Sequence, residues 1–524
     1  MGAGSSVTAA EAAGLSSGSK VKIYNQLANE AEVLYANGVT NPAETMKILQ
    51  TRHSDLVKLY SSSSGVSPLQ CPKVRFGRTE LQVPILSLGG MRQQETWSPP
   101  EGMKLENINK EIQANFEAIA ERAMSLGINH FETARGYGTS ELQFSPVLKK
   151  YDRSSYILQT KVAPKADSSE FRKMLEKSFS ELGLGPDGFV DLFSFHGINK
   201  LEHLAWICND GGNYAVIEEY LAAGKIKHVG FSTHGMAPLI VSAIETNRFD
   251  YVNLHYHWCG SYTASGSGPT GGNDVALEAA KKHDMGVFII SPTDKGGSLY
   301  EPSKLLYHDC LPLTPIAYND LWLWSHDTIH TIVIGAARPE DFDEHLDAAL
   351  KWESRKELSA PIAAKLQKRV TSELGDDFFS TWSRELPDAY ENPLGVGIGY
   401  LYWLWWIVKF WGLYSYAKNR YASLEGNVKT WDDNKTADEN KQLFSWVPGL
   451  PYLPEKEEEI RLSLGDRLTP SRADHVMNSI KEVHFWLRNG GCLSRPNEAE
   501  PSGVDVAMWR SAYSLCPDKP YPER

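Results

Sequence analysis

The sequence predicts an α/β protein built on a (β/α)8 TIM barrel, with an N-terminal helical extension and a C-terminal helical appendage. Short apolar segments of strand length alternate along the chain with amphipathic helical patterns, which is typical of parallel sheets. Several of these strands end in a polar side chain that is able to do chemistry. In a parallel barrel, the loops that leave the carboxyl ends of the strands gather on one face, where active sites lie.

The clearest strand-to-loop transition lies between Asn129 and Glu141. The segment begins as an apolar strand, breaks at two glycines that flank Tyr137, and restarts as a helix with Ser140 as the expected N-cap. This pattern places Glu132 at the end of a strand and Tyr137 in the loop that follows. Taken alone, the segment fits a plain strand-to-helix turn with an exposed tyrosine better than it fits a site.

Two later segments end in the same way, and they change that interpretation. The apolar strand from Tyr156 ends at Lys161, and the strand from Val190 ends at His196. Helical patterns follow both strands. A carboxylate, a phenol, an amine and an imidazole at the ends of three successive strands form a convergent polar set, which indicates an active site.

These residues resemble the motif of the aldo/keto reductases. The chain reads Phe-Glu-Thr-Ala around Glu132, then Tyr-Gly at 137 and Ser-Glu at 140, with the lysine and the histidine at the family's intervals. The resemblance implies that Tyr137 is the proton donor, that Lys161 lowers the pKa of its phenol, and that His196 orients the substrate carbonyl. It also implies that the acid anchors the lysine, although the family's usual residue there is aspartate.

The resemblance runs from about residue 74 to 350 and implies the order of the barrel. A hairpin from 74 to 84 would close the bottom of the barrel. The eight strands are expected at 83–91, 129–132, 156–161, 190–196, 226–232, 251–257, 286–292 and 330–334, with a loop-like insertion at 206–214. The expected domains are an N-terminal extension and linker at 1–70, the barrel at 71–352, the appendage at 353–425 and a C-terminal extension at 426–524.

A nicotinamide cofactor is also implied, with NADP(H) favoured over NAD(H). Gly90 and Met91, at the end of the first strand, would face the nicotinamide, although a tight turn is the alternative reading of the glycine. The family binds the carboxamide with a Ser-Asn pair after the fifth strand and a glutamine on the sixth. Ser232, Thr233 and Asn253 stand at those positions, so the polar groups survive in kind.

The remaining cofactor contacts are expected after the last two strands, at Ser291, Lys295, Gly296, Gly297, Gly335, Ala336 and Arg338. Lys295 and the glycine amides suit a pyrophosphate. The segment after the eighth strand is expected to open a helix, whose N-terminus suits a phosphate. Arg338 is the candidate for the adenosine 2′-phosphate, and Asp341 replaces a second basic residue that many relatives carry.

Composition excludes several other classes of function. The 524 residues are 42% hydrophobic and 23% charged, with a formal net charge of −12 and no basic cluster, so no nucleic-acid surface is expected. The six cysteines are far apart, which indicates free thiols in the cytoplasm, and the iron-sulfur cysteine cluster of some longer relatives is missing. His196, His255 and His257 could share a metal, but hydrogen-bonded pocket histidines are the commoner case, so no metal is expected.

Two segments raise the question of membrane association. Gly2 and Ser6 fit an N-myristoylation pattern, with a small-residue terminus as an equal alternative, and one such chain would bind a membrane only weakly. Residues 394–416 form an apolar stretch rich in Trp and Tyr. A helix docked on the barrel or lying at an interface is favoured over a transmembrane span. Residues 21–60 indicate helix interrupted near 38–42, and 61–65 indicate a linker.

Two functional hypotheses follow. The first is an NADP-dependent carbonyl reductase acting on an aldehyde or ketone. The second is a cofactor-binding barrel with weak catalysis that acts as a redox sensor or scaffold, as the β subunits of voltage-gated potassium channels show is possible in this family. Four departures from the family pattern favour the second hypothesis. They are Glu132, Thr233, Asn253 and Ile290, the last of which stands where relatives often carry an aromatic ring. The intact acid, phenol, amine and imidazole favour the first.

Overall fold

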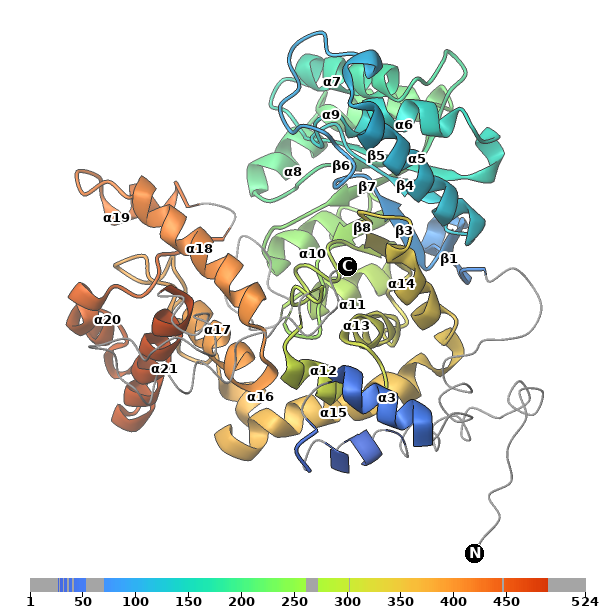
Figure 1. Cartoon of the computed structure of the whole chain (residues 1–524). Helices are drawn as coiled ribbons and strands as arrows, with labels where there is room; N and C mark the ends of the chain where they lie inside the picture. Colours follow the sequence, from blue (N-terminus) through green and yellow to red (C-terminus); the bar gives the residue numbers. More distant parts are fainter. Residues whose placement is uncertain are drawn as a thin grey trace, which may run out of the picture.

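The computed structural model describes residues 27, 29–31, 33–34, 37–39, 42–52, 70–260, 272–300, 302–444 and 447–488. Its centre is a closed barrel of eight parallel strands with the order β10-β3-β4-β5-β6-β7-β8-β9 (Figure 1). The strands are β3 (Leu86–Gly89), β4 (His130–Glu132), β5 (Ile157–Val162), β6 (Val190–Phe195), β7 (Ile226–Ser232), β8 (Tyr251–Leu254), β9 (Gly286–Ile289) and β10 (Thr331–Ile334). The predicted (β/α)8 fold is confirmed.

A short antiparallel hairpin closes the bottom of the barrel, as expected. It consists of β1 (Lys73–Arg75) and β2 (Gln82–Pro84), with Val74 opposite Val83. Phe76, fully buried, packs inside with Tyr251 and Phe288. Because the bottom is filled by these apolar side chains, the opposite face is left for a site.

Helices surround the barrel and follow the strands. They are α5 (Lys110–Ser125), α6 (Ser140–Leu148), α7 (Ser168–Glu181), α8 (Leu201–Cys208), α9 (Asn213–Ala222), α10 (Ala237–Glu245), α11 (Asp274–Lys282), α12 (Lys304–Cys310), α13 (Pro315–Trp324) and α14 (Asp341–Ala349). The expected loop at 206–214 is wrong at its start, because α8 runs to Cys208. Leu204 and Ile207 bury one side of that helix, which stabilises it.

Ser140 is the first residue of α6 and not its N-cap, because its hydroxyl is used elsewhere. The Ser140 Oγ atom donates to the Gly90 carbonyl and contacts Thr133 Oγ1 at 2.8 Å. The helix after β10 begins at Asp341, later than expected, because Asp341 Oδ2 accepts from the backbone amides of Ala337 and Arg338. The sixth barrel strand also stops early, at Leu254.

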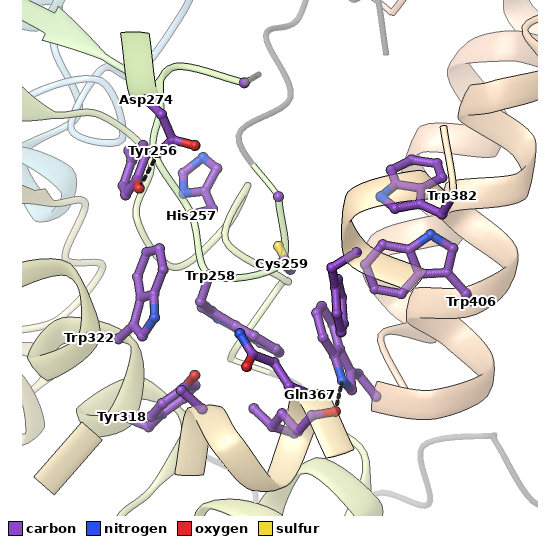
Figure 2. Close-up of a pocket in the computed structure, with 16 residues that line it drawn as sticks. Tyr256, His257, Trp258, Cys259, Asp274, Tyr318, Trp322, Gln367, Trp382 and Trp406 are labelled. Carbon is purple, nitrogen blue, oxygen red and sulfur yellow. Dashed lines mark hydrogen bonds between the residues drawn. The ribbon is translucent and has the colours of Figure 1, made fainter. Parts of the chain in front are cut away.

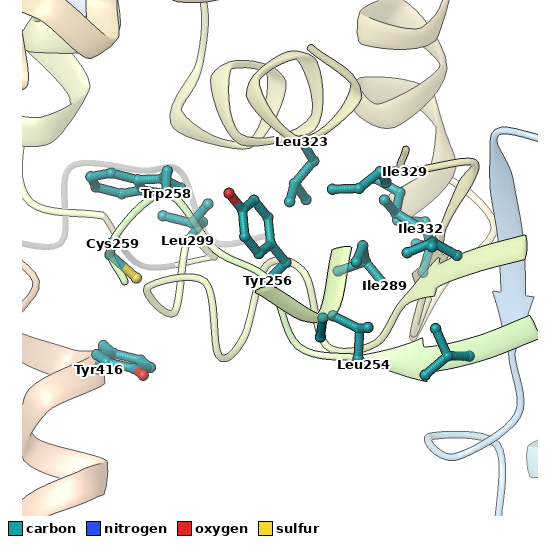
Figure 3. Packing of buried hydrophobic residues seen from close by; sticks show 14 of the residues in the cluster. Leu254, Tyr256, Trp258, Cys259, Ile289, Leu299, Leu323, Ile329, Ile332 and Tyr416 are labelled. Atoms are coloured by element: carbon teal, nitrogen blue, oxygen red, sulfur yellow. The ribbon is translucent and has the colours of Figure 1, made fainter. Parts of the chain in front are cut away.

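The appendage lies to one side of the barrel, in orange and red in Figure 1. It comprises α15 (Arg355–Leu374), α16 (Phe378–Thr381), α17 (Ile398–Trp411), α18 (Tyr414–Thr430), α19 (Ala437–Lys441), α20 (Glu457–Ser463) and α21 (Pro470–Arg488). One continuous apolar cluster joins it to the barrel, and Figure 3 follows this cluster from Leu254 and Ile289 through Trp258 to Tyr416 of α18. The barrel and the appendage therefore share a core.

Helix α17 forms the centre of the appendage and carries the aromatic stretch found in the sequence. All of its residues except Tyr400 and Lys409 are buried. Its tryptophans bond to three neighbours. The Nε1 atom of Trp403 donates to the Cys259 carbonyl at 3.0 Å, that of Trp411 to the Leu366 carbonyl at 3.0 Å, and that of Trp405 to Glu482 at 2.7 Å. The interpretation as a docked helix is confirmed. In the part of the chain that the structure describes, no helix combines the length and apolarity that a membrane span needs.

The N-terminal extension contributes α3 (Pro42–Arg52). Leu27, Leu34 and Leu49 pack on Leu311 of the barrel, and the expected interruption is present as a turn at Gly38. The myristoylation pattern at Gly2, the linker at 61–65, Cys492 and Cys516 lie outside the described residues.

Candidate active site

Parallel strand ends bring the predicted acid and amine together inside the barrel mouth. Glu132 ends β4, and Lys161 lies near the end of the neighbouring β5. The two residues are 2% and 1% exposed. The Lys161 Nζ atom forms an ion pair with the Glu132 carboxylate and donates to the Thr133 carbonyl at 2.7 Å. The longer glutamate therefore still reaches the lysine that the family's aspartate would hold.

The phenol and the imidazole complete the group. The Lys161 Nζ atom lies 4.6 Å from the centroid of the Tyr137 ring. The rings of Tyr137 and His196 meet edge to face, with centroids 5.4 Å apart. The four side chains that the sequence singled out therefore share one site at the carboxyl ends of β4, β5 and β6.

The electrostatics of the site differ from the expectation in one respect. Burial raises the pKa of the Tyr137 phenol well above its usual value, and the nearby Glu132 charge raises it further. Lys161 was expected to lower this pKa. The pKa of Lys161 itself is lowered by burial, against which the Glu132 carboxylate acts. Tyr137 is thus a protonated phenol at neutral pH.

His196 is held neutral. Burial and then the Lys161 charge lower the pKa of the imidazole to about 3. A neutral imidazole carries one N–H donor and one acceptor, so His196 can donate a hydrogen bond to a substrate oxygen without adding a positive charge to the site.

Buried ion pairs fix the loop that carries Tyr137. The Arg135 Nη1 atom contacts Glu141 at 2.7 Å and Glu181 at 2.6 Å. Glu141 also accepts from Thr160 Oγ1 at 2.6 Å. The segment after Gly136 is therefore tied to α6, α7 and β5, which holds the phenol in place beside Lys161.

A small cavity of about 60 Å³ opens beside the phenol. Its lining comprises Gly89, Met91, Arg92, Glu132, Tyr137, Ile290, Ser291, Pro292, Thr293, Asp294, Tyr300, Val333 and Gly335. Arg92 and Asp294 lie 3.9 Å apart and join the loops after β3 and β9. Sequence reasoning missed this pair, although each residue lies within a few positions of a predicted cofactor residue.

The matching family model is the aldo/keto reductase family, and it matches residues 86–300, from the first barrel strand to the loop after β9. This match covers most of the barrel and supports an oxidoreductase role.

Several solved structures are similar to part of the chain. A reductase from Pseudomonas aeruginosa is 18% identical and covers 58% of this chain and 99% of its own, with a TM-score of 0.40. One from Klebsiella pneumoniae, in complex with NADP and acetate, is 18% identical and covers 53% and 90%, with a TM-score of 0.40. One from Bacillus halodurans is 17% identical and covers 56% and 96%, with a TM-score of 0.42. No curated protein matches the chain.

Some of the predicted cofactor residues line the cavity. Met91, Ser291 and Gly335 do so. Ala336 is buried next to them, and its carbonyl accepts from Gln93 at 2.6 Å. A side chain at Gly90 would lie 2.5 Å from the Phe144 ring. The close approach that requires this glycine comes from the protein itself.

The residues expected at the carboxamide are largely engaged with the protein. The Ser232 Oγ atom accepts from the Gly197 amide, and Thr233 Oγ1 donates to the Ile198 carbonyl at 2.8 Å. Asn253 differs. Its Oδ1 atom accepts from Gln159, but its buried Nδ2 atom has no hydrogen-bond partner among the described residues. An unsatisfied buried amide donor fits a ligand carbonyl.

Lys295 turns inward from its glycine-containing loop. Its Nζ atom lies 3.2 Å from His255 Nε2, and that nitrogen lies 2.5 Å from His234 Nδ1. Burial, and then the charge of Arg420 on α18, lower the pKa of Lys295 to about 7. No sequence motif indicates Arg420, because the appendage is remote from the loop along the chain. Gly296 packs against the Pro292 carbonyl, and Gly297 has a φ of +130°.

Arg338 is half exposed at the expected phosphate position, and a carboxylate of the protein already occupies part of that position. Arg338 Nη2 contacts Asp341 Oδ1 at 3.0 Å. Asp341 also accepts from two backbone amides, and Asp343 and Glu344 lie in the same first turn of α14. A phosphate there would have to displace Asp341 from the arginine. In the described part of the chain, no three His, Cys, Asp or Glu side chains form a metal-binding group.

Proposed function

We propose that the barrel reduces an aldehyde or ketone with NADPH as the hydride donor and Tyr137 as the proton donor. The observation that carries this proposal is the buried contact of Lys161 with both the Glu132 carboxylate and the Tyr137 ring, with His196 at the ring edge. Packing alone does not explain this arrangement, because burying a charged pair costs free energy that apolar side chains would not cost. Buried charged groups of this kind are typical of functional sites.

A bound NADPH would supply the hydride. As the carbonyl carbon accepts it, the substrate oxygen gains negative charge and requires a proton. Tyr137 provides it, because the phenol is protonated at neutral pH and lies within the group formed with Lys161 and His196. The Lys161 ammonium beside the ring then stabilises the phenolate that remains, and neutral His196 donates a hydrogen bond to the oxygen.

Several groups near the phenol support the cofactor part of the proposal. Met91, Ser291 and Gly335 lie beside the phenol. The Asn253 side-chain amide suits the nicotinamide carboxamide. Arg338 suits the 2′-phosphate if the phosphate replaces Asp341 as the partner of the guanidinium. This Arg338 position supports NADPH over NADH.

The test is Tyr137→Phe in the full chain. We expect NADPH affinity to stay within about twofold, because the change removes one hydroxyl, and turnover to fall by roughly 10²–10⁴-fold, the range of a lost general acid. NADPH oxidation against a panel of aldehydes and ketones measures turnover, and fluorescence titration with NADPH and NADH measures binding. Tyr390→Phe, at a 41% exposed tyrosine of the appendage, is the matched control. Retained turnover in Tyr137→Phe contradicts the assignment.

A second candidate function is a cofactor-binding redox sensor or scaffold. The small cavity favours this candidate, because about 60 Å³, lined by the Arg92–Asp294 pair, leaves little room for a substrate. The same two assays separate the candidates. NADPH binding without oxidation of NADPH by any carbonyl compound supports the sensor, whereas substrate-dependent oxidation supports the reductase.

A further inference from the structure

A larger cavity, of about 230 Å³, lies between the barrel and the appendage. Figure 2 shows Trp258 and Trp322 of the barrel on one side and Trp382 and Trp406 of the appendage on the other. It shares no lining residue with the cavity beside Tyr137. It is therefore a separate space, formed only because the appendage docks on the barrel.

The cavity is open to solvent on the appendage side. Gln367 of α15 is exposed, and Phe379 of α16 is 37% exposed, and both belong to the lining. A ligand therefore has a route into the cavity that does not pass the Tyr137 site.

Buried polar atoms of the lining lack partners. The residues His257, Trp258 and Trp406 are 3%, 8% and 3% exposed. Both ring nitrogens of His257 and the Nε1 atoms of Trp258 and Trp406 have no hydrogen-bond partner among the described residues. Buried polar groups normally have partners, and leaving several unpaired around one cavity is costly.

Other polar groups of the same lining are satisfied. Trp411 Nε1 donates to the Leu366 carbonyl, and the Tyr256 hydroxyl donates to Asp274 at 2.5 Å. Among the polar groups of the lining, the unsatisfied ones are therefore the two indole N–H donors and the imidazole ring of His257. Burial lowers the pKa of His257 to about 3, so this ring is neutral and adds one donor and one acceptor.

We propose that this cavity binds an uncharged planar aromatic molecule of about two fused rings, whose oxygen atoms accept hydrogen bonds from Trp258 and Trp406. Flat aromatic walls favour a flat aromatic ligand, which can stack or meet them edge to face. The unpaired indole N–H groups require acceptors. Asp274, the one carboxylate of the lining, disfavours an anion. The proposal is independent of the reductase proposal, because neither the lining nor the route involves Tyr137.

The test uses coumarin, a planar bicyclic lactone, with the full chain. Quenching of tryptophan fluorescence and calorimetry should show saturable binding at one site. Ala363→Leu, at a residue of the lining on α15, should weaken binding by tenfold or more because its side chain enters the cavity. Ala364→Leu is the matched control, since Ala364 is the next residue and is exposed. It should bind coumarin as the wild type does.

Trp406→Phe keeps an aromatic ring and removes one donor, so binding should weaken about three- to tenfold, the value of one hydrogen bond. This variant also decides the question if Ala363→Leu fails to fold, which thermal unfolding reveals. Absence of saturable binding to the wild type overturns the proposal. Equal affinity in the wild type and a folded Ala363→Leu, or in the wild type and Trp406→Phe, also overturns it, because binding would then lie elsewhere.

Discussion

Glu132 is one methylene group longer than the family's usual aspartate, and its ion pair with Lys161 is kept. The carboxylate is buried with Lys161, and the backbone carbonyl of Thr133 takes a second N–H of the same ammonium. A buried ammonium that has lost its carboxylate partner costs several kcal/mol, whereas the intact pair costs far less. Both the stability of the strand ends and the proposed chemistry therefore depend on this pair.

Glu132→Gln should lower the free energy of unfolding by about 3–5 kcal/mol, because it leaves Lys161 buried without a countercharge. Glu132→Asp, which restores the family's usual residue, should lower it by much less, since the charge is kept. Urea unfolding at pH 7 measures both values. A Gln variant as stable as the wild type would show that the Lys161 ammonium is neutralised or hydrated and that the pair is not a buried one.

Sequence reasoning at the residue scale succeeded where a motif is local and failed where contacts are remote. Lys161 and His196 were identified because each lies at the end of a recognisable strand, and Tyr137 because it lies in the loop that follows one. The rise in the pKa of the Tyr137 phenol could not be foreseen, because it depends on burial that a sequence does not display. Arg420 was missed because it reaches the His255 region from α18, and only docking of the appendage brings it there.

At the scale of elements, the junction between α17 and α18 determines how the appendage turns. Gly412 ends α17 with a φ of +66°, in the left-handed region. A side chain there would also lie 2.1 Å from Ser303 Oγ, the residue that caps α12 of the barrel. The turn and its contact with the barrel thus both require glycine.

Gly412→Ala should therefore destabilise the protein by roughly 1–3 kcal/mol, through backbone strain and displacement of Ser303. Gly426→Ala is the matched control. Gly426 lies within α18, is exposed and has nothing near the position of a Cβ atom, so alanine should stabilise that helix by about 1 kcal/mol. Opposite signs in thermal or urea unfolding are expected. Equal and small effects would show that the junction tolerates a side chain.

At the scale of the whole molecule, buried histidines link stability to pH. Burial lowers the pKa values of His130, His196 and His257 to about 3, against about 6.5 in an unfolded chain. Between these pH values the unfolded chain binds protons that the native protein does not. The contribution of these groups to stability is therefore complete above about pH 6.5 and is lost as the pH falls toward 3.

Each such histidine should reduce the free energy of unfolding by about 1.4 kcal/mol per pH unit in that window. We expect the urea midpoint to fall steeply from pH 6.5 to pH 4.5. His130→Gln, in the barrel interior, should make the dependence of the free energy of unfolding on pH shallower, by the amount that one fewer bound proton causes. A midpoint that does not change over this range would contradict the burial of these rings in the native state.

The barrel itself could be predicted from the sequence, because its strands are apolar runs with turn residues between them. The joint between barrel and appendage could not. The aromatic stretch is predicted as a helix docked on the barrel or lying at an interface, but nothing along the chain indicates that Trp403 reaches Cys259 or that the 230 Å³ cavity forms beside them. Such contacts are set by the packing of surfaces far apart in sequence, which periodicity does not encode.

Three different neighbours cover α17: the barrel through Trp403, α15 through Trp411, and α21 through Trp405. The last of these, Pro470–Arg488, follows α17 by dozens of residues. During synthesis, the barrel and α15 precede α17, but the face of α17 that α21 covers must stay exposed until α21 has been translated. A nascent chain at that stage presents a sticky aromatic surface to its surroundings, and its yield in a cell depends on how well folding helpers protect that interval.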